Sequence, residues 1–133
     1  GAASVEVCVR DAGRAASVVD LGHALGLVME VRPLARLAEP PGADLVISTV
    51  PGGTDLGLSP SDELAGSPLL DVAYSPWPTA LAAAWTERGG AVAHGLGMLV
   101  HQALLQVRIF VNGDPFAELP DEGAVLDVMR RSV

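Results

Sequence analysis

Short apolar stretches alternate along this chain with longer segments of helical periodicity. Residues 4–9 (S-V-E-V-C-V) alternate in polarity and are β-branched, which predicts a short strand. Residues 12–27 carry Ala, Leu and Val at helical spacing, which predicts a helix that closes near Gly26. A second strand is predicted at 28–31, and a connection with a turn of helix at 33–42.

The same alternation continues through the rest of the chain. Residues 44–49 (D-L-V-I-S-T) form a nearly continuous apolar run, which is typical of a strand covered on both faces. The further predicted elements are a loop at 51–60, a buried strand at 68–72, a helix capped by Thr79 that runs through Arg88 and is ended by Gly89-Gly90, an edge strand at 91–93, and helices at 96–111 and 122–131. Strands that alternate with helices indicate an α/β protein with a parallel sheet.

The composition fits one domain with a real core, since half of the 133 residues are apolar. No apolar segment reaches the roughly 18 residues of a membrane span, and no charged-then-apolar leader stands at the N-terminus. The net charge of −8 argues against sequence-independent nucleic-acid binding. The single Cys8 fits a reducing compartment, so we expect a cytoplasmic protein.

Two residue types narrow the candidate chemistry. All eight basic residues are arginines, so a mechanism that needs a lysine must obtain it from other polypeptide. The three histidines are scattered, with no carboxylate at ligand spacing, and predict no metal site. We expect His94 at the surface and His23 in a structural position. His101 should lie outside any site on its helix face, because it is about 100° around the helix from Gln102.

Polar residues near the carboxyl ends of the predicted strands are the candidate ligand-binding residues. Tyr74, the only tyrosine, follows the strand at 68–72 and is either a ligand contact or a half-buried loop aromatic. Met98 and Gln102 are four residues apart and share a helix face. A buried glutamine needs a partner, so Gln102 is either satisfied by neighbours or available to a ligand.

Three motifs resemble the signatures of the shikimate dehydrogenase family, in its C-terminal NADP-binding domain. They are D-V-A-Y-S-P-W-P-T at 71–79, G-L-G-M-L-V-H-Q-A at 95–103, and V-R-D-A-G-R-A at 9–15, where the family carries N-R-T-x-x-R-[AK]. The motifs keep the family's order and spacing. The resemblance implies a partial Rossmann-like, doubly wound parallel sheet with C-terminal helices, residues 1–133 being the C-terminal part of a dinucleotide-binding domain.

The resemblance implies that Arg10 and Arg14 contact the 2′-phosphate of NADP, a task that suits the planar guanidinium group. Val9 and Asp11 depart from the family's asparagine and threonine. A carboxylate at Asp11 repels a 2′-phosphate but can bind the free 2′-hydroxyl of NAD. NADP is therefore the expected cofactor, with NAD as the alternative.

The resemblance also implies which residues contact the nicotinamide half of the cofactor and the substrate. The cofactor-binding positions are Thr49, Val50, Pro51, Val72, Gly95 and Met98, and the substrate-binding positions are Tyr74 and Gln102. The implied reaction is the reversible, NADPH-dependent reduction of 3-dehydroshikimate to shikimate in aromatic amino acid biosynthesis. The alternatives are a quinate-type or NAD-preferring relative, and a non-catalytic nucleotide-binding or assembly module.

Two parts of the family pattern are absent from the sequence. The catalytic lysine–aspartate pair belongs to an N-terminal substrate domain, and the first strand, glycine-rich turn and helix of the nucleotide domain are not represented either. We therefore expect a fragment that is inactive alone and that needs the missing N-terminal part of the same protein or a second copy. Without the first strand, the strands at 4–9 and 44–49 should lie two strand spacings apart, roughly 10 Å. Other polypeptide should fill that slot, or the two strands should close up.

Overall fold

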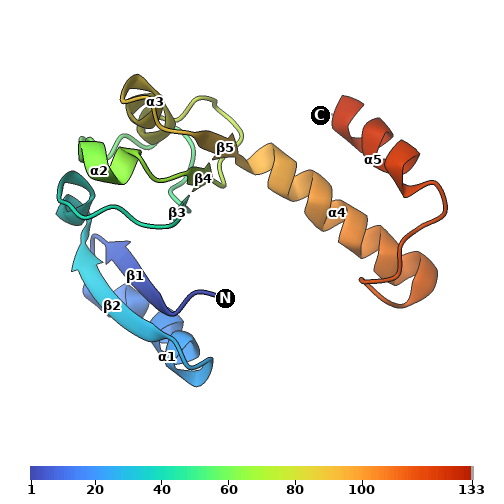
Figure 1. The fold of residues 1–133 in the computed structure, drawn as a ribbon, viewed down its shortest axis with the longest axis horizontal. Coiled ribbons are helices and arrows are strands. Elements are labelled where there is room, and N and C mark those ends of the chain that lie inside the picture. The colour runs from blue at the N-terminus through green and yellow to red at the C-terminus, as the bar shows by residue number, and fades with distance from the viewer. Residues whose placement is uncertain (133) are drawn as a thin grey trace.

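The α/β class expected from the sequence is confirmed by the computed structural model, which describes residues 1–132 (Figure 1). In chain order the elements are β1 (Ser4–Val9), the 3-10 helix η1 (Ala12–Ala15), α1 (Ala16–Ala24), β2 (Val28–Pro33), the 3-10 helix η2 (Leu34–Ala38), β3 (Val46–Ser48), α2 (Asp62–Ala65), β4 (Leu69–Asp71), α3 (Ala80–Glu87), β5 (Val92–His94), α4 (Gly95–Asn112) and α5 (Glu122–Arg131). Each pair of neighbouring strands is parallel. None of the helices in this part of the chain has the length and apolar character needed to cross a membrane.

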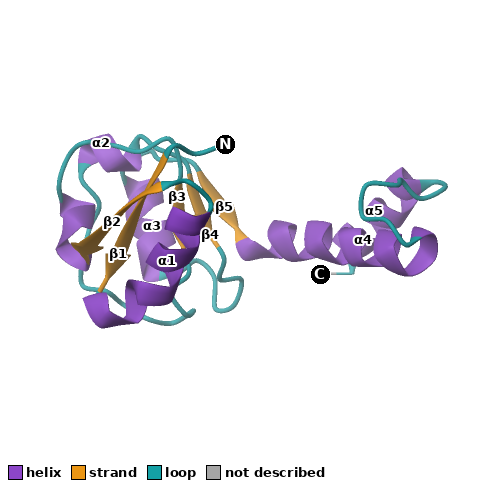
Figure 2. Ribbon diagram, turned by 90° about the horizontal axis from the view of Figure 1, so that it is seen from below, coloured by secondary structure: helices purple, strands orange, loops and turns teal. Residues whose placement is uncertain are grey.

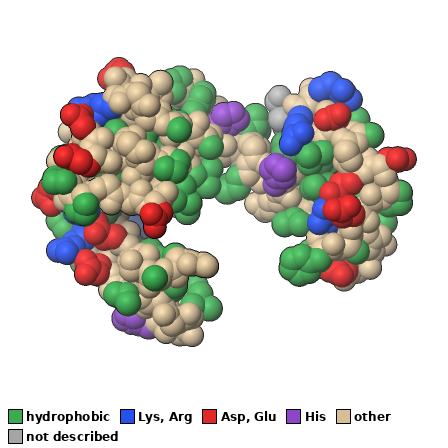
Figure 3. All heavy atoms as spheres, viewed as in Figure 1, with side chains coloured by type: hydrophobic (Ala, Val, Ile, Leu, Met, Phe, Trp, Pro, Cys, Tyr) green, Lys and Arg blue, Asp and Glu red, His purple; other side chains and the backbone are tan. Residues whose placement is uncertain are grey.

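The strands form two separate sheets instead of one. β1 pairs with β2, and β4 lies between β3 and β5. In Figure 2 β1 and β3 lie at the facing edges of the two sheets, and the space-filling view shows a notch between the two parts of the body (Figure 3). Within residues 1–132 these edges have no strand partner. The strands β1 and β3 have therefore not closed up, which was one of the expected outcomes, and the filling of the slot by other polypeptide stays a prediction.

The main core lies between the three-stranded sheet and the helices α2 and α3. Its buried members are Leu37, Leu64, Ala65, Leu69, Leu81 and Trp85. The indole of Trp85 is fully buried, and its Nε1–H donates to the Ser67 carbonyl at 2.9 Å. This bond satisfies the one polar atom of the side chain, so Trp85 fills the core without the cost of an unpaired donor.

The expectation that residues 44–49 are covered on both faces is wrong. Leu45 and Ile47 are 51% and 56% exposed, while Val46 packs against the core and Ser48 is buried. Side chains alternate between the two faces of a strand, and only one face of β3 is covered by the described helices. The second face of β3 is therefore apolar but is not covered by the described residues.

The short helix α2 was not predicted from the sequence. Ser61 is its N-cap, and the Ser61 hydroxyl accepts a hydrogen bond from the Leu64 N–H at 3.1 Å. Asp62 and Glu63 follow in the first turn, where acidic side chains stabilise the helix dipole. The serine followed by two acids was the available signal, but four residues are too few for periodicity to reveal a helix.

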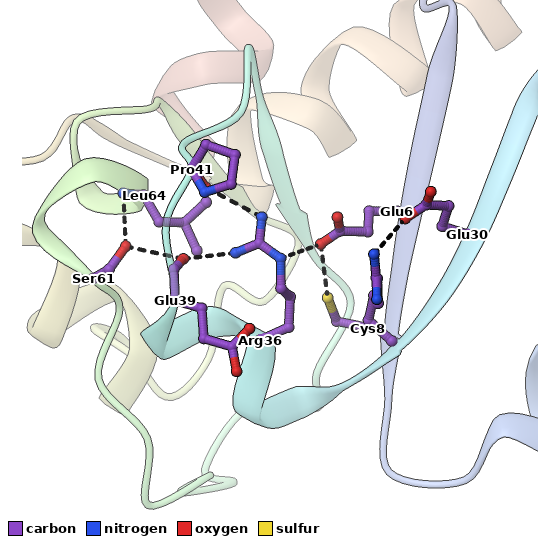
Figure 4. Close-up of polar contacts among 9 residues, drawn as sticks. Glu6, Cys8, Glu30, Arg36, Glu39, Pro41, Ser61 and Leu64 are labelled. Carbon is purple, nitrogen blue, oxygen red and sulfur yellow. Dashed lines mark hydrogen bonds and ion pairs between the residues drawn. The ribbon is translucent and has the colours of Figure 1, made fainter.

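Arg36 joins the two-stranded sheet to the rest of the body (Figure 4). Its Nε lies 2.8 Å from Oε1 of Glu6 on β1, and its terminal nitrogens donate to the carbonyls of Glu39 at 2.6 Å and Pro41 at 3.2 Å. The Ser61 hydroxyl donates to the same Glu39 carbonyl. The Arg36 side chain is 13% exposed and that of Glu6 is 36% exposed, so the ion pair is partly shielded from water, and it ties β1 to the segment that leads to β3.

The helices α4 and α5 form an arm that extends away from the body (Figures 1 and 2). Gly113, at φ 73°, ends α4, and the chain turns back into α5. The guanidinium of Arg108 makes two bonds to the carboxylate of Glu122, one of them 2.7 Å long, and also donates to the Pro115 carbonyl. The two side chains are 15% and 19% exposed, so a partly buried, bidentate ion pair holds the arm together.

The stability of this arm should depend on the charge of Glu122. Hydrogen bonds from Arg108 and from the Leu119 N–H lower the pKa of the Glu122 carboxyl. A lowered pKa in the folded state stabilises the arm fully above the ordinary carboxyl value of about 4.3, and the stabilisation is lost as the pH falls through the folded value. Glu122→Gln should accelerate amide hydrogen exchange in α5 at neutral pH, whereas Asp127→Asn, an exposed carboxylate on the same helix, should not. Equal exchange in both variants would contradict this role.

Candidate functional site

Three segments meet at the carboxyl end of the three-stranded sheet. The loop after β3 contains residues 49–54, the loop after β4 contains residues 72–79, and α4 begins directly after β5. The Val72 N–H donates to the Ser48 carbonyl at 3.0 Å, and the Gly95 N–H donates to the Ala73 carbonyl at 3.1 Å. Backbone hydrogen bonds therefore place Val72 and Gly95, two predicted cofactor-binding residues, against one another.

The contact at Gly95 requires a glycine. A Cβ atom at this position would overlap the carbonyl oxygen of Val72, which is backbone and cannot rotate away. Gly95 is also buried, so the start of α4 cannot shift toward solvent without breaking the bond to Ala73. The absence of a side chain thus brings the first turn of α4 next to the loop that carries Tyr74.

A second glycine contact joins the loop after β3 to the loop after β4. A Cβ atom on Gly52 would lie 2.5 Å from the carbonyl oxygen of Ser75, so these two backbones also touch. The predicted residues Thr49, Val50 and Pro51 precede this contact, and Tyr74 is next to it. The structure therefore brings together the segments that the sequence separates by more than twenty positions.

The loop at 72–79 is fixed at both ends by Asp71. This carboxylate is 1% exposed; it accepts a hydrogen bond from the Ala73 N–H at 3.2 Å and another from the Thr79 hydroxyl at 2.5 Å. The Thr79 oxygen in turn accepts from the Ala82 N–H and caps α3, as the sequence predicted. Asp71 was not among the residues predicted from the sequence, although a lone acid inside a buried strand was a signal that it needs a partner.

Tyr74, Met98 and Gln102 all lie at the surface. Tyr74 is 55% exposed, Met98 is 38% exposed, and Gln102 is exposed on α4 one turn beyond Met98. None of the three lines either of the two surface pockets described below. They come from adjoining elements, because α4 begins against the Tyr74 loop, but a common cavity between them stays a prediction.

The predicted phosphate-binding residues lie on the other sheet, after β1. Arg10 lines a pocket of about 220 Å³ at the carboxyl ends of β1 and β2, together with Val9, Ala12, Val31, Arg32 and Pro33. Arg14 is exposed on η1 and is not among the lining residues. Asp11 is the N-cap of η1, and its Oδ1 accepts from the Gly13 N–H at 2.9 Å. Asp11, which stands where the family motif has threonine, therefore caps η1 in this chain.

A second pocket, of about 250 Å³, lies on another flank of α4. It is lined by His94, Leu96, Gly97, Val100, His101 and Arg130. His94 is exposed, as expected; its Nδ1 accepts from the Leu96 N–H at 3.2 Å, and its ring lies 5.2 Å from that of Trp77. Across residues 1–132 no cluster of three or more His, Cys, Asp or Glu side chains could hold a metal ion.

Parallel strands joined by helices, with glycine-mediated backbone contacts at their carboxyl ends, define a Rossmann-like α/β fold. Comparison with known proteins identifies the family. The chain is 36% identical over 108 residues to the NADP-dependent shikimate dehydrogenase of Methylobacterium radiotolerans, a match that covers 78% of this chain and 38% of that protein. The resemblance to the shikimate dehydrogenases is thereby confirmed. No protein-family model matches the chain.

Solved structures agree with this assignment. The chain superposes on shikimate dehydrogenase from Mycobacterium tuberculosis with a TM-score of 0.77 at 34% identity, covering 100% of this chain and 48% of the other. A shikimate 5-dehydrogenase from Thermus thermophilus, in complex with NADP(H) and shikimate, gives 0.65 at 28% identity, covering 97% and 46%. The chain therefore spans less than half the length of each of these three relatives.

The Gly95 contact can be tested with a matched pair of substitutions on α4. Gly95→Ala should destabilise the fold by about 2 kcal/mol or more, because the new methyl group overlaps backbone. Gly97→Ala, where a Cβ meets nothing within 4 Å, should stabilise the helix by about 0.5–1 kcal/mol. Chemical denaturation of the two variants measures both effects. A Gly95→Ala variant as stable as the unsubstituted chain would show that the contact is not close.

Proposed function

We propose that this chain is part of an NADP-dependent oxidoreductase of the shikimate dehydrogenase type, which reduces 3-dehydroshikimate reversibly to shikimate. The observation that carries the proposal is the backbone contact between Gly95 and Val72. It sets the start of α4, the helix that carries Met98 and Gln102, beside the loop that bears Tyr74. The names of the similar proteins support the reaction and the cofactor.

We assign the nicotinamide half of the cofactor to the carboxyl end of the three-stranded sheet. Backbone at Thr49–Pro51, the side chain of Val72, the backbone of Gly95 and the side chain of Met98 would form one wall for the nicotinamide ribose and ring. A glycine at the head of α4 suits this role, because it lets a flat ring approach the backbone closely. When bound, the reduced nicotinamide supplies the hydride that the reaction transfers.

The substrate contacts would come from Tyr74 and Gln102. A phenolic hydroxyl and a carboxamide can both donate to and accept from the hydroxyl groups of a polyhydroxylated ring. These residues orient the ring and do not exchange its proton. No lysine occurs in the chain, so the acid–base pair expected from the resemblance would come from polypeptide outside residues 1–133.

NADP is the cofactor that we propose, ahead of NAD. The pocket at the ends of β1 and β2 is lined in part by Arg10, and a guanidinium group suits a phosphate group. The carboxylate of Asp11, the residue that favoured NAD in the sequence, is engaged with the Gly13 N–H. A capping carboxylate is less available to a ribose hydroxyl, so the argument for NAD is weakened.

The unpaired edges of β1 and β3 support a further part of the proposal. Each edge offers parallel-strand hydrogen-bonding groups that need partners when they are buried. We propose that a strand from the N-terminal part of the same protein lies between them, with a second copy of the chain as the alternative source. The cytoplasmic location expected from the sequence stays a prediction.

The proposed activity can be tested by following reduced nicotinamide in the protein that contains this chain. We expect turnover of shikimate with NADP, slower turnover with NAD, and none by residues 1–133 alone. Gln102→Leu should raise the KM for shikimate about tenfold, since a lost hydrogen bond to a polar substrate costs on the order of 1–2 kcal/mol.

Gln106 provides the matched control, because it is exposed one turn further along α4. Gln106→Leu should leave the KM for shikimate and the KM for NADP unchanged. If the two substitutions had the same effect on the KM for shikimate, Gln102 would not be a substrate contact. An unsubstituted protein that turns over neither cofactor with shikimate would overturn the proposed reaction.

A further inference from the structure

The pocket at the carboxyl ends of β1 and β2 holds a second arginine that no sequence motif identifies. Arg10 and Arg32 both line it, and the rest of its wall is formed by the apolar residues Val9, Ala12, Val31 and Pro33. Arg32 lies on β2, and Arg10 directly follows the neighbouring parallel strand β1. In the strand register Cys8 lies opposite Arg32 and Val9 opposite Pro33, so Arg10 follows directly where the pairing ends.

The size of the pocket suits a small anionic group. Its volume is about 220 Å³. One water molecule occupies ~30 Å³ in the liquid, so the pocket has room for about seven waters, or for a phosphate group and part of the sugar that carries it. A guanidinium group offers several N–H donors in one plane, which matches the oxygens of a phosphate.

The charges around Arg32 leave it able to bind an anion. Among residues 1–132 its one hydrogen-bond partner is Glu30, with Arg32 Nη2 lying 2.9 Å from Glu30 Oε2, and both side chains are about half exposed. This single-point contact orients the guanidinium and leaves its other N–H groups for a ligand. The nearby carboxylate of Asp11 is engaged with the Gly13 N–H, and that of Glu6 lies 2.8 Å from Arg36.

We propose that Arg32 is a specificity-determining residue that recognises, together with Arg10, a phosphate on the 2′-oxygen of an adenosine. The inference rests on the proposed function, because it assigns this pocket to the adenosine half of a dinucleotide. The family motif instead pairs Arg10 with Arg14. Arg14 is on η1 outside the pocket wall, whereas Arg32 is part of that wall.

The test compares two nucleotides that differ only in the 2′-phosphate. Adenosine 2′,5′-bisphosphate and adenosine 5′-monophosphate are titrated by calorimetry into the protein that contains this chain, with its remaining polypeptide present. The unsubstituted protein should bind the bisphosphate at least tenfold more tightly. Arg32→Gln should reduce that preference about fivefold to tenfold, because each arginine–phosphate contact at a half-exposed site contributes on the order of 1 kcal/mol.

Two further variants separate a specific contact from a general effect of charge. Glu30→Gln removes the competing carboxylate and should increase the preference for the bisphosphate. Arg131→Gln, on the last turn of α5, changes the net charge as Arg32→Gln does and should leave the preference unchanged. Circular dichroism confirms that each variant is folded.

The outcomes distinguish this inference from the proposed function. A preference that Arg32→Gln leaves intact, or that Arg131→Gln reduces equally, overturns the role of Arg32 alone. An unsubstituted protein with no preference for the bisphosphate overturns the phosphate site itself. Loss of the preference in Arg32→Gln supports the inference even if the protein turns over no shikimate, because the titration does not depend on activity.

Discussion

The contacts of the Arg36 guanidinium are the interaction on which the relative position of the two sheets depends. The two sheets share no strand pairing, so the backbone does not fix their relative position. Arg36 supplies that constraint by binding Glu6 on β1 and two carbonyls in the segment that leads to β3. Because the Arg36 side chain is only 13% exposed, its ion pair with Glu6 is less screened by water than a fully exposed pair. Arg36 thereby links the sheet that carries the pocket lined by Arg10 and Arg32 to the segment that leads to the three-stranded sheet.

Most element positions could be predicted because their causes are local. The strand at 4–9 and the helix at 122–131 were placed with the bounds that the structure gives, since alternation and caps act over a few residues. The cover on each face of a strand is a tertiary property, and 44–49 shows the limit of the prediction. Its continuous apolar pattern was identified, but the elements that would cover Ile47 are not among the described residues.

The site was partly predictable for the same reason. The motif resemblance predicted Val72 and Gly95 as cofactor-binding residues, but only the structure shows that a side chain at Gly95 would meet the Val72 carbonyl. Arg32 was missed because nothing in a one-dimensional pattern tells which strand ends become neighbours. In the sequence Arg32 is a polar residue near the end of a short strand. Only the register of β1 and β2 shows that it lines the same pocket as Arg10. The burial of Asp71 and its bond to Thr79 were likewise beyond periodicity.

The facing edges of β1 and β3 would make this polypeptide prone to self-association when no other strand lies between them. Backbone groups pair with any extended chain, whatever its side chains. The edges that would accept one particular strand would therefore also accept a strand from an unrelated molecule. Newly made molecules would compete with one another for these positions, and crowding would favour entangled multimers over single copies. Solubility and resistance to proteolysis would then depend on how soon the proposed strand binds between β1 and β3.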